Sequence, residues 1–174
     1  MPQPHIMLGG VPIVLHAGAP ELSEEAIGGS VVVRMSDGAG MKMQHWQRMA
    51  GSISGSGWIP AGLDGLDYTQ PLDLWSTQVN AIHGGLEHDL SGAPRPDVAP
   101  WADALIGDRW VSASLQFTPG TVDAPPHVSI TAVPGATQYR VCWMPAYKVL
   151  ANRPPKTQSS GTATHGWTIT WEEA

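Results

Sequence analysis

The chain has 174 residues, a formal net charge of −6 and only 14% charged side chains, while 42% of its residues are hydrophobic. Its nine Lys and Arg residues form no basic run, which argues against a direct nucleic-acid binder, because such proteins carry a basic face. No segment approaches the roughly 20 apolar residues of a membrane span, and the N-terminus lacks the regions of a signal peptide. We expect a soluble protein made in a reducing cytoplasm, and its sparse charge favours a subunit of a larger assembly.

Twenty glycines and sixteen prolines interrupt short apolar runs along the whole chain. This pattern is typical of an all-β protein with many turns. We predict an all-β fold, a β-barrel or β-sandwich with long loops and at most a short helix. The connector at residues 91–100 predicts an N-terminal β lobe over residues 1–92 and a C-terminal β lobe over residues 93–174, with a single domain as the alternative.

The first half of the chain reads as two hairpins and a further strand. Gly9-Gly10 suits a two-residue hairpin turn, and Pro12 places the following strand at a sheet edge. A second turn is expected at residues 37–40 after a Val-rich run. A helix over residues 41–49 competes with the returning strand, because Met, Lys and Gln are good helix formers. The strands predicted here are residues 5–8, 11–16, 30–36, 41–53 and 72–78.

The second half repeats the β pattern. Asp97 is expected to cap a short helical turn through residues 101–105, and Pro134-Gly135 supplies a turn. Residues 152–166 are polar and predict an extended, exposed arm or a long loop. The strands predicted here are residues 110–117, 128–133, 138–149 and 167–171.

Side chains with catalytic or metal-binding chemistry are scattered. His83, Glu87, His88 and Asp89 form the densest group, but the group lacks the spacing of a zinc site, and a polar surface loop is the favoured interpretation. Cys142, the only cysteine, is expected to be a small buried hydrophobe. No nucleotide-binding or hydrolase motif is present. We therefore expect no enzyme activity, no cofactor and no metal site.

Eight tryptophans and one glycine-rich segment, residues 52–72, are the distinctive features that remain. Tryptophan is enriched in cores and in subunit interfaces. If Trp58, Trp101 and Trp110 were exposed, they would instead suit a sugar-stacking platform. The glycines of the segment are expected to permit turns that aim large side chains inward or at a neighbour. The candidate interface residues are Trp58, Ile59, Leu63, Leu66, Tyr68, Trp167 and Trp171.

Several stretches together resemble small structural proteins of tailed-bacteriophage virions. The order is a strand and turn at residues 30–38, then His45-Trp46, then GSGWIPAGLDGLDYTQPL at residues 55–72. Residues 133–143 and 167–174 are similar to segments of phage tail proteins. A clear long helix, which many tube-type tail folds carry, is missing.

The resemblance implies a virion component of the tail tube or distal tail that forms homo-oligomeric rings, hexameric or trimeric, and contacts other tail proteins. Loops at residues 38–40 and 55–62 would pack on the ring above or below. DNA would only pass through the lumen, which the acidic balance suits because phosphate affinity comes from Lys and Arg. A capsid decoration protein or a carbohydrate-binding β-sandwich is the alternative.

Overall fold

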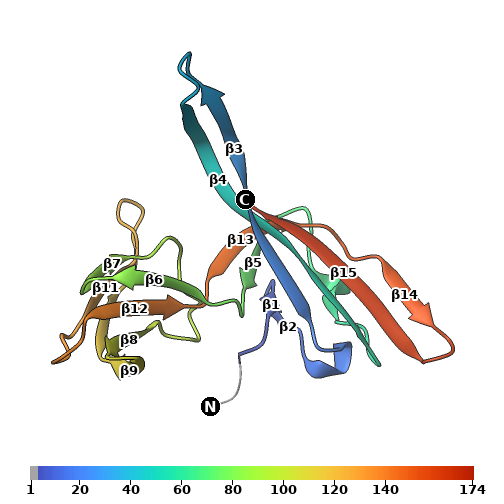
Figure 1. Ribbon diagram of the computed structural model, residues 1–174. Coiled ribbons are helices and arrows are strands. Elements are labelled where there is room, and N and C mark those ends of the chain that lie inside the picture. Colours follow the sequence, from blue (N-terminus) through green and yellow to red (C-terminus); the bar gives the residue numbers. More distant parts are fainter. Residues whose placement is uncertain (1–3) are drawn as a thin grey trace. The chain divides into compact units, whose positions relative to one another are not determined.

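The computed structural model describes residues 4–174 and is all-β, as predicted (Figure 1). Every strand pair whose register is resolved is antiparallel. Within residues 4–174 no helix is long and apolar enough to span a membrane. The strands are β1 (Met7–Leu8), β2 (Val11–Pro12), β3 (Glu21–Arg34), β4 (Gly40–Gly57), β5 (Leu72–Trp75), β6 (Asn80–Gly84), β7 (Glu87–Asp89), β8 (Trp101–Ile106), β9 (Arg109–Ala113), β10 (Leu115–Thr118), β11 (His127–Ile130), β12 (Gln138–Trp143), β13 (Ala146–Ala151), β14 (Lys156–Ser159) and β15 (Thr164–Glu173). Two 3-10 turns, η1 (Leu15–Ala17) and η2 (Leu63–Gly65), complete the order.

The chain forms two compact units. The middle unit contains Asp73–Tyr147 with the N-terminal residues up to Met7, and the end unit contains Leu8–Leu72 with Lys148–Ala174. The boundary expected between residues 92 and 93 instead falls inside the middle unit. The reason is long-range pairing, because β15 forms a ladder with β4 and so joins the C-terminal residues to the first half of the chain.

The middle unit has two sheets around one core. One sheet has the order β6-β12-β8-β9 and the other has the order β10-β11-β7. Residues alternate between half-buried and buried along β8, which is a strand where a helical turn was predicted. The inward side chains of both sheets form the core: Leu90, Ala102, Ala104, Ala113, Val128, Ile130, Val141 and Trp143.

A buried arginine holds the connector of this unit in place. Arg95 is only 1% exposed. Its guanidinium pairs with Asp97, with Nε 2.6 Å from Oδ1 and Nη2 2.8 Å from Oδ2. It also donates to the carbonyl oxygens of Ser76 and His5, each at 2.9 Å. Asp97 is therefore the partner of Arg95 and caps no helix, contrary to the prediction.

The end unit is built on the sheet β2-β1-β5-β13-β15-β4-β3, to which β14 adds on β15. The boundary between the units falls within β1, β5 and β13. The glycine turn between β1 and β2 is confirmed, since Gly9 and Gly10 have φ values of 56° and 82°. Pro12 lies in the edge strand β2, as expected.

Only part of the polar stretch at residues 152–166 is a loop, contrary to the prediction. Its Ser- and Thr-rich part forms β14, which pairs with the first half of β15 from Lys156↔Trp167 to Ser159↔Thr164. The polar composition fits a solvent-facing hairpin, because all four residues of β14 are exposed.

Glycines of β4 make room for tryptophans of β15. Trp167 lies opposite Gly55 and Trp171 lies opposite Gly51 in the ladder. A Cβ on Gly55 would stand 2.6 Å from the Trp167 ring, and a Cβ on Gly51 would stand 2.0 Å from the Ser23 carbonyl oxygen. The prediction that Gly55 forms a turn is wrong, because Gly55 is a strand residue that admits an indole ring.

Candidate interaction surface

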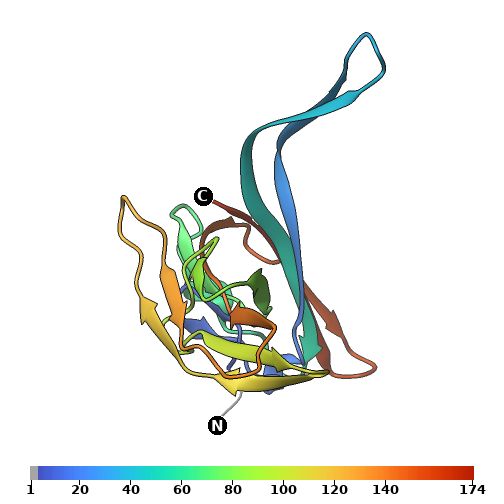
Figure 2. The same ribbon diagram turned by 60° about the vertical axis from the view of Figure 1, so that its left-hand side comes forward.

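The hairpin of β3 and β4 is longer than the sheet to which it belongs. β15 pairs with β4 only from Ala50 to Gly57, whereas β3 and β4 stay paired with each other to Arg34↔Gly40. Residues 27–48 therefore form a free-standing hairpin, which we call the arm, and both views show it extending away from the rest of its sheet (Figures 1 and 2). Its two edges carry the unpaired backbone groups that pair readily with another chain.

Local sequence explains why the arm forms. Three consecutive valines, Val31–Val33, favour an extended backbone. At the tip, Gly38 adopts a φ of 84°, and the Asp37 carboxylate accepts a hydrogen bond from the Ala39 N–H at 2.9 Å. The predicted turn and the predicted return strand are confirmed, so the helix considered for residues 41–49 does not form.

One face of the arm is apolar. Val31 lies opposite Met43, and Val33 lies opposite Met41, so these four side chains share that face. Trp46 covers Gly29 at the bulge and extends the same row. These five side chains are each 44–53% exposed, although they are large and apolar. Contiguous exposed apolar surface of this kind marks an interaction site.

The arm also differs in charge from the rest of the chain. Arg34, Lys42 and Arg48 against Asp37 give it a net charge of +2. All other residues together then carry −8, because the whole chain carries −6. The arm is thus a small cationic and apolar element on an acidic protein.

The glycine-rich segment contributes only part of the interface that its sequence predicted. Trp58 and Ile59 are 80% and 56% exposed, and they follow directly after β4 in the end unit. The Ile59 N–H donates to the His16 carbonyl oxygen at 3.1 Å, which orders the backbone of this loop. The two side chains remain candidates for contact with a partner.

The other predicted interface residues are wholly or partly inside the end unit. Leu63, Trp167 and Trp171 are at most 6% exposed, so they belong to the core and offer no surface to a neighbour. Leu66 and Tyr68 are half-buried. The Tyr68 hydroxyl donates to the Leu63 carbonyl oxygen at 2.9 Å, and burial raises the pKa of Tyr68.

Glu87 and Asp89, the acidic residues of the predicted histidine cluster, both bond to His127, which the sequence analysis did not include in the cluster. His127 bonds through Nδ1 to Asp89 and through Nε2 to Glu87, both at 2.7 Å. These two carboxylates raise the pKa of His127, Asp89 having the larger effect. His88 points elsewhere, because it is buried and lies 2.9 Å from the Gly85 carbonyl oxygen. Only the pairing of β7 with β11 brings His127 to this place.

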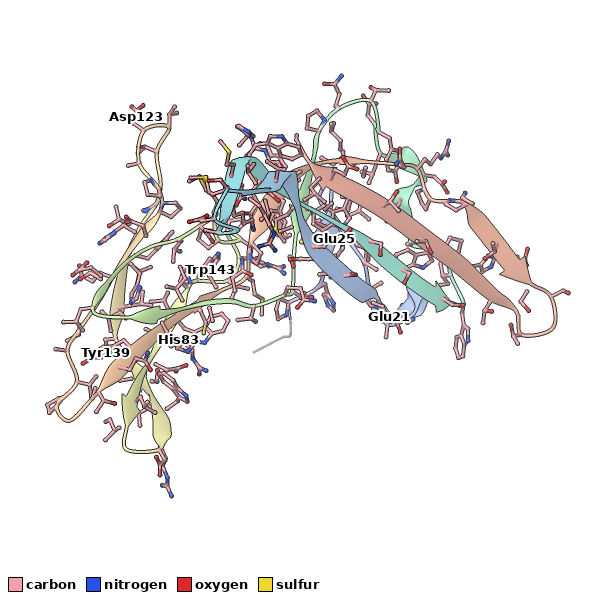
Figure 3. The ribbon with its side chains drawn as sticks, turned by 45° about the horizontal axis from the view of Figure 1, so that its top comes forward. Glu21, Glu25, His83, Asp123, Tyr139 and Trp143 are labelled. Atoms are coloured by element: carbon pink, nitrogen blue, oxygen red, sulfur yellow. The ribbon has the colours of Figure 1, made fainter. Side chains whose placement is uncertain are left out.

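A second exposed cluster lies on the outer face of the β6-β12-β8-β9 sheet. The Arg140 guanidinium lies over the Trp110 ring at 4.5 Å and pairs with Asp103 at 2.7 Å. His83 packs against the same indole, with ring centroids 5.6 Å apart. Figure 3 labels His83 of this cluster; Tyr139, also labelled, lies on the opposite face of the sheet and packs against the core. Trp110 is 37% exposed, so part of its ring faces solvent.

Cys142 is buried, as the sequence indicated. Burial raises the pKa of its thiol, which keeps the thiol protonated and unreactive.

Comparisons with known proteins do not identify a family for this chain. No protein-family model matches the chain, and neither a curated protein nor a solved structure gives a significant match. The class that the structure itself defines is an all-β protein with several antiparallel sheets and an exposed β-hairpin arm.

Proposed function

We propose that the chain is a structural protein of a tailed-bacteriophage virion, a tail tube or distal tail component that assembles into homo-oligomeric rings. The arm is the observation that carries this proposal. It exposes an apolar face and two unpaired strand edges, which are costly for a monomer and useful for a subunit. The resemblance in residues 30–38 and 55–72 supports the same class of protein.

In this role the protein works through contacts and not through catalysis. Strand edges add to neighbouring sheets by main-chain hydrogen bonds, and apolar side chains supply the area buried. The acidic remainder of the chain suits a lumen through which DNA passes without being held. Partners are further copies of the chain and other virion proteins.

An arm-deleted variant tests the proposal. Ala26 and Met49 lie opposite each other, so an Asn-Gly turn can replace residues 27–48 and close the hairpin. Wild-type protein should form rings or tubes in negative-stain images. The deleted variant should stay monomeric and keep a β-type circular dichroism spectrum and a cooperative unfolding transition, which show that the remaining sheet is folded. A wild-type protein that stays monomeric at high concentration and is absent from virions by mass spectrometry would contradict the proposal.

A carbohydrate-binding module is the second candidate, and the partly exposed Trp110 beside Arg140 and His83 favours it. Aromatic rings on a β-sheet face suit sugar stacking, and flanking polar groups suit hydroxyl recognition. Tryptophan fluorescence with a glycan panel distinguishes the two candidates. Quenching that is lost in Trp110→Ala, with no self-assembly of the wild type, would favour this second function.

A further inference from the structure

A groove of about 600 Å³ lies on the sheet of the end unit, at the base of the arm. It extends over β3, β4, β15 and β13 and is lined by polar and acidic side chains together with Tyr68 and Leu150. Leu150 is 51% exposed, so the groove also offers apolar surface.

Two carboxylates define the charge of this groove. Glu25 on β3 and Glu172 on β15 both lie opposite Ala50 of the central strand β4, so they share one face of the sheet. Two strand spacings separate them by about 10 Å. Both side chains are exposed, and Figure 3 shows Glu25 with Glu21 along β3. The groove is therefore an acidic receptor with room for a strand or hairpin.

The arm has the properties that this receptor requires. Lys42 and Arg48 are both exposed on β4, Arg48 on the apolar face beside Trp46 and Lys42 on the opposite face beside Val32. Opposite charges across an interface steer association and set its register. The apolar face of the arm can pack against the apolar surface of the groove, which comes from the exposed Leu150 and the half-buried Tyr68. The acidic remainder of the chain is thus the electrostatic complement of the arm.

The arm cannot reach the groove of its own copy. It begins two residues after Glu25 and leaves along the direction of β3 and β4. Folding back would break the ladder that continues to Arg34↔Gly40. Its 22 residues fall within the roughly 20 to 30 residues that each partner contributes to a stable interface. From Ala26 to Arg34 it reaches about 26 Å, at about 3.3 Å per residue, which is enough to span to a neighbouring molecule.

We infer that the arm of one copy docks in the Glu25–Glu172 groove of the next copy. This inference rests on the proposed self-assembly and specifies its contact. Because the arm and the groove are different surfaces, the contact is head-to-tail, and repetition closes a ring or extends a filament.

A charge exchange tests the contact. The double variant Lys42→Glu/Arg48→Glu makes the arm acidic, and the double variant Glu25→Lys/Glu172→Lys makes the groove basic. Each variant alone should associate at least tenfold more weakly than wild type in sedimentation velocity. An equimolar mixture should regain association, because each arm then meets a groove of opposite charge. Arg109→Glu and Asp123→Lys, which change exposed charges of the middle unit, should associate like wild type.

The outcomes separate the contact from the function. If wild type assembles and both double variants assemble equally well, the arm–groove contact is wrong while the proposed assembly stands. If the variants are monomeric but the mixture shows no recovery, the electrostatic pairing is wrong. If wild type does not self-associate, or if the arm binds DNA in a salt-dependent way without self-association, the inference is overturned together with its premise. Circular dichroism of each variant confirms that the fold is retained.

Discussion

Replacement of Arg95 by methionine should destabilise the middle unit strongly. Methionine keeps much of the apolar stem but removes the charge and every donor. The loss leaves the Asp97 carboxylate and the carbonyl oxygens of Ser76 and His5 without the four hydrogen bonds that the guanidinium supplies. The position of the guanidinium over Trp75, 5.7 Å from the ring centroid, is lost as well.

The magnitude follows from the burial of this group. Breaking a buried ion pair by removing one partner costs about 3–5 kcal/mol. Asp97 is 40% exposed on its side chain, and water can therefore solvate part of the freed carboxylate. We expect a loss near the lower end, about 3 kcal/mol, which is a large share of the roughly 5–15 kcal/mol that stabilises a typical domain. An exposed arginine such as Arg109 should cost no more than about 0.5 kcal/mol when replaced by methionine.

Hydrogen exchange read by mass spectrometry is the suitable assay, because two units need not unfold together and a single unfolding midpoint is then undefined. Amides of β12 in the middle unit should lose protection by about a hundredfold, since 1.4 kcal/mol corresponds to a factor of ten. Amides of β15 near Ile169 should change much less. Equal protection of β12 in Arg95→Met and Arg109→Met would refute the structural role of Arg95.

The same ion pair has a defined pH dependence. The hydrogen bonds that Asp97 accepts from Arg95 hold the pKa of the Asp97 carboxyl below its usual value of 3.8. A carboxylate with a depressed folded-state pKa contributes stability that is present above the unfolded pKa and is lost as the pH falls through the folded pKa. Acid should therefore weaken wild type more than Arg95→Met below about pH 4.

Three further predictions concern other sites. The imidazole of His127 should titrate above 6.5 by NMR, because Asp89 and Glu87 stabilise its charged form; its contribution to stability is complete below pH 6.5 and is lost as the pH rises through the higher folded-state pKa. Gly55→Ala should destabilise the end unit by about 1–3 kcal/mol in urea unfolding, because its Cβ would overlap the Trp167 ring. Trp58→Ala should change the unfolding midpoint little and reduce ring formation in negative-stain images.

Each of these predictions has a matched control. Asp89→Asn should return the His127 titration toward 6.5, and an unchanged midpoint would show that the contact does not control the pKa. Gly92→Ala should be nearly neutral, because no atom beyond its chain neighbours lies within 4 Å of the added Cβ. Val122→Ala, at another highly exposed apolar residue, should leave assembly intact. If Trp58→Ala assembles like Val122→Ala, the Trp58 loop is not a contact.

The sequence determined the all-β class and most strand positions, because alternation, β-branched residues and glycine turns act over a few neighbouring residues. The valine run, the Asp37–Gly40 turn and the Gly9-Gly10 hairpin are of this kind. Cys142 was placed correctly for the same reason, since a thiol in an apolar strand run tends to be buried.

Only the tertiary structure decided which side chains are buried and which are presented. Trp167 and Trp58 look alike in sequence, but the ladder of β15 on β4 buries the first over Gly55, while the second lies beyond the end of β4 and is exposed. Long-range pairing likewise joined His127 to its carboxylates and left the arm without neighbours. Burial depends on partners distant in sequence, and a local pattern cannot specify them.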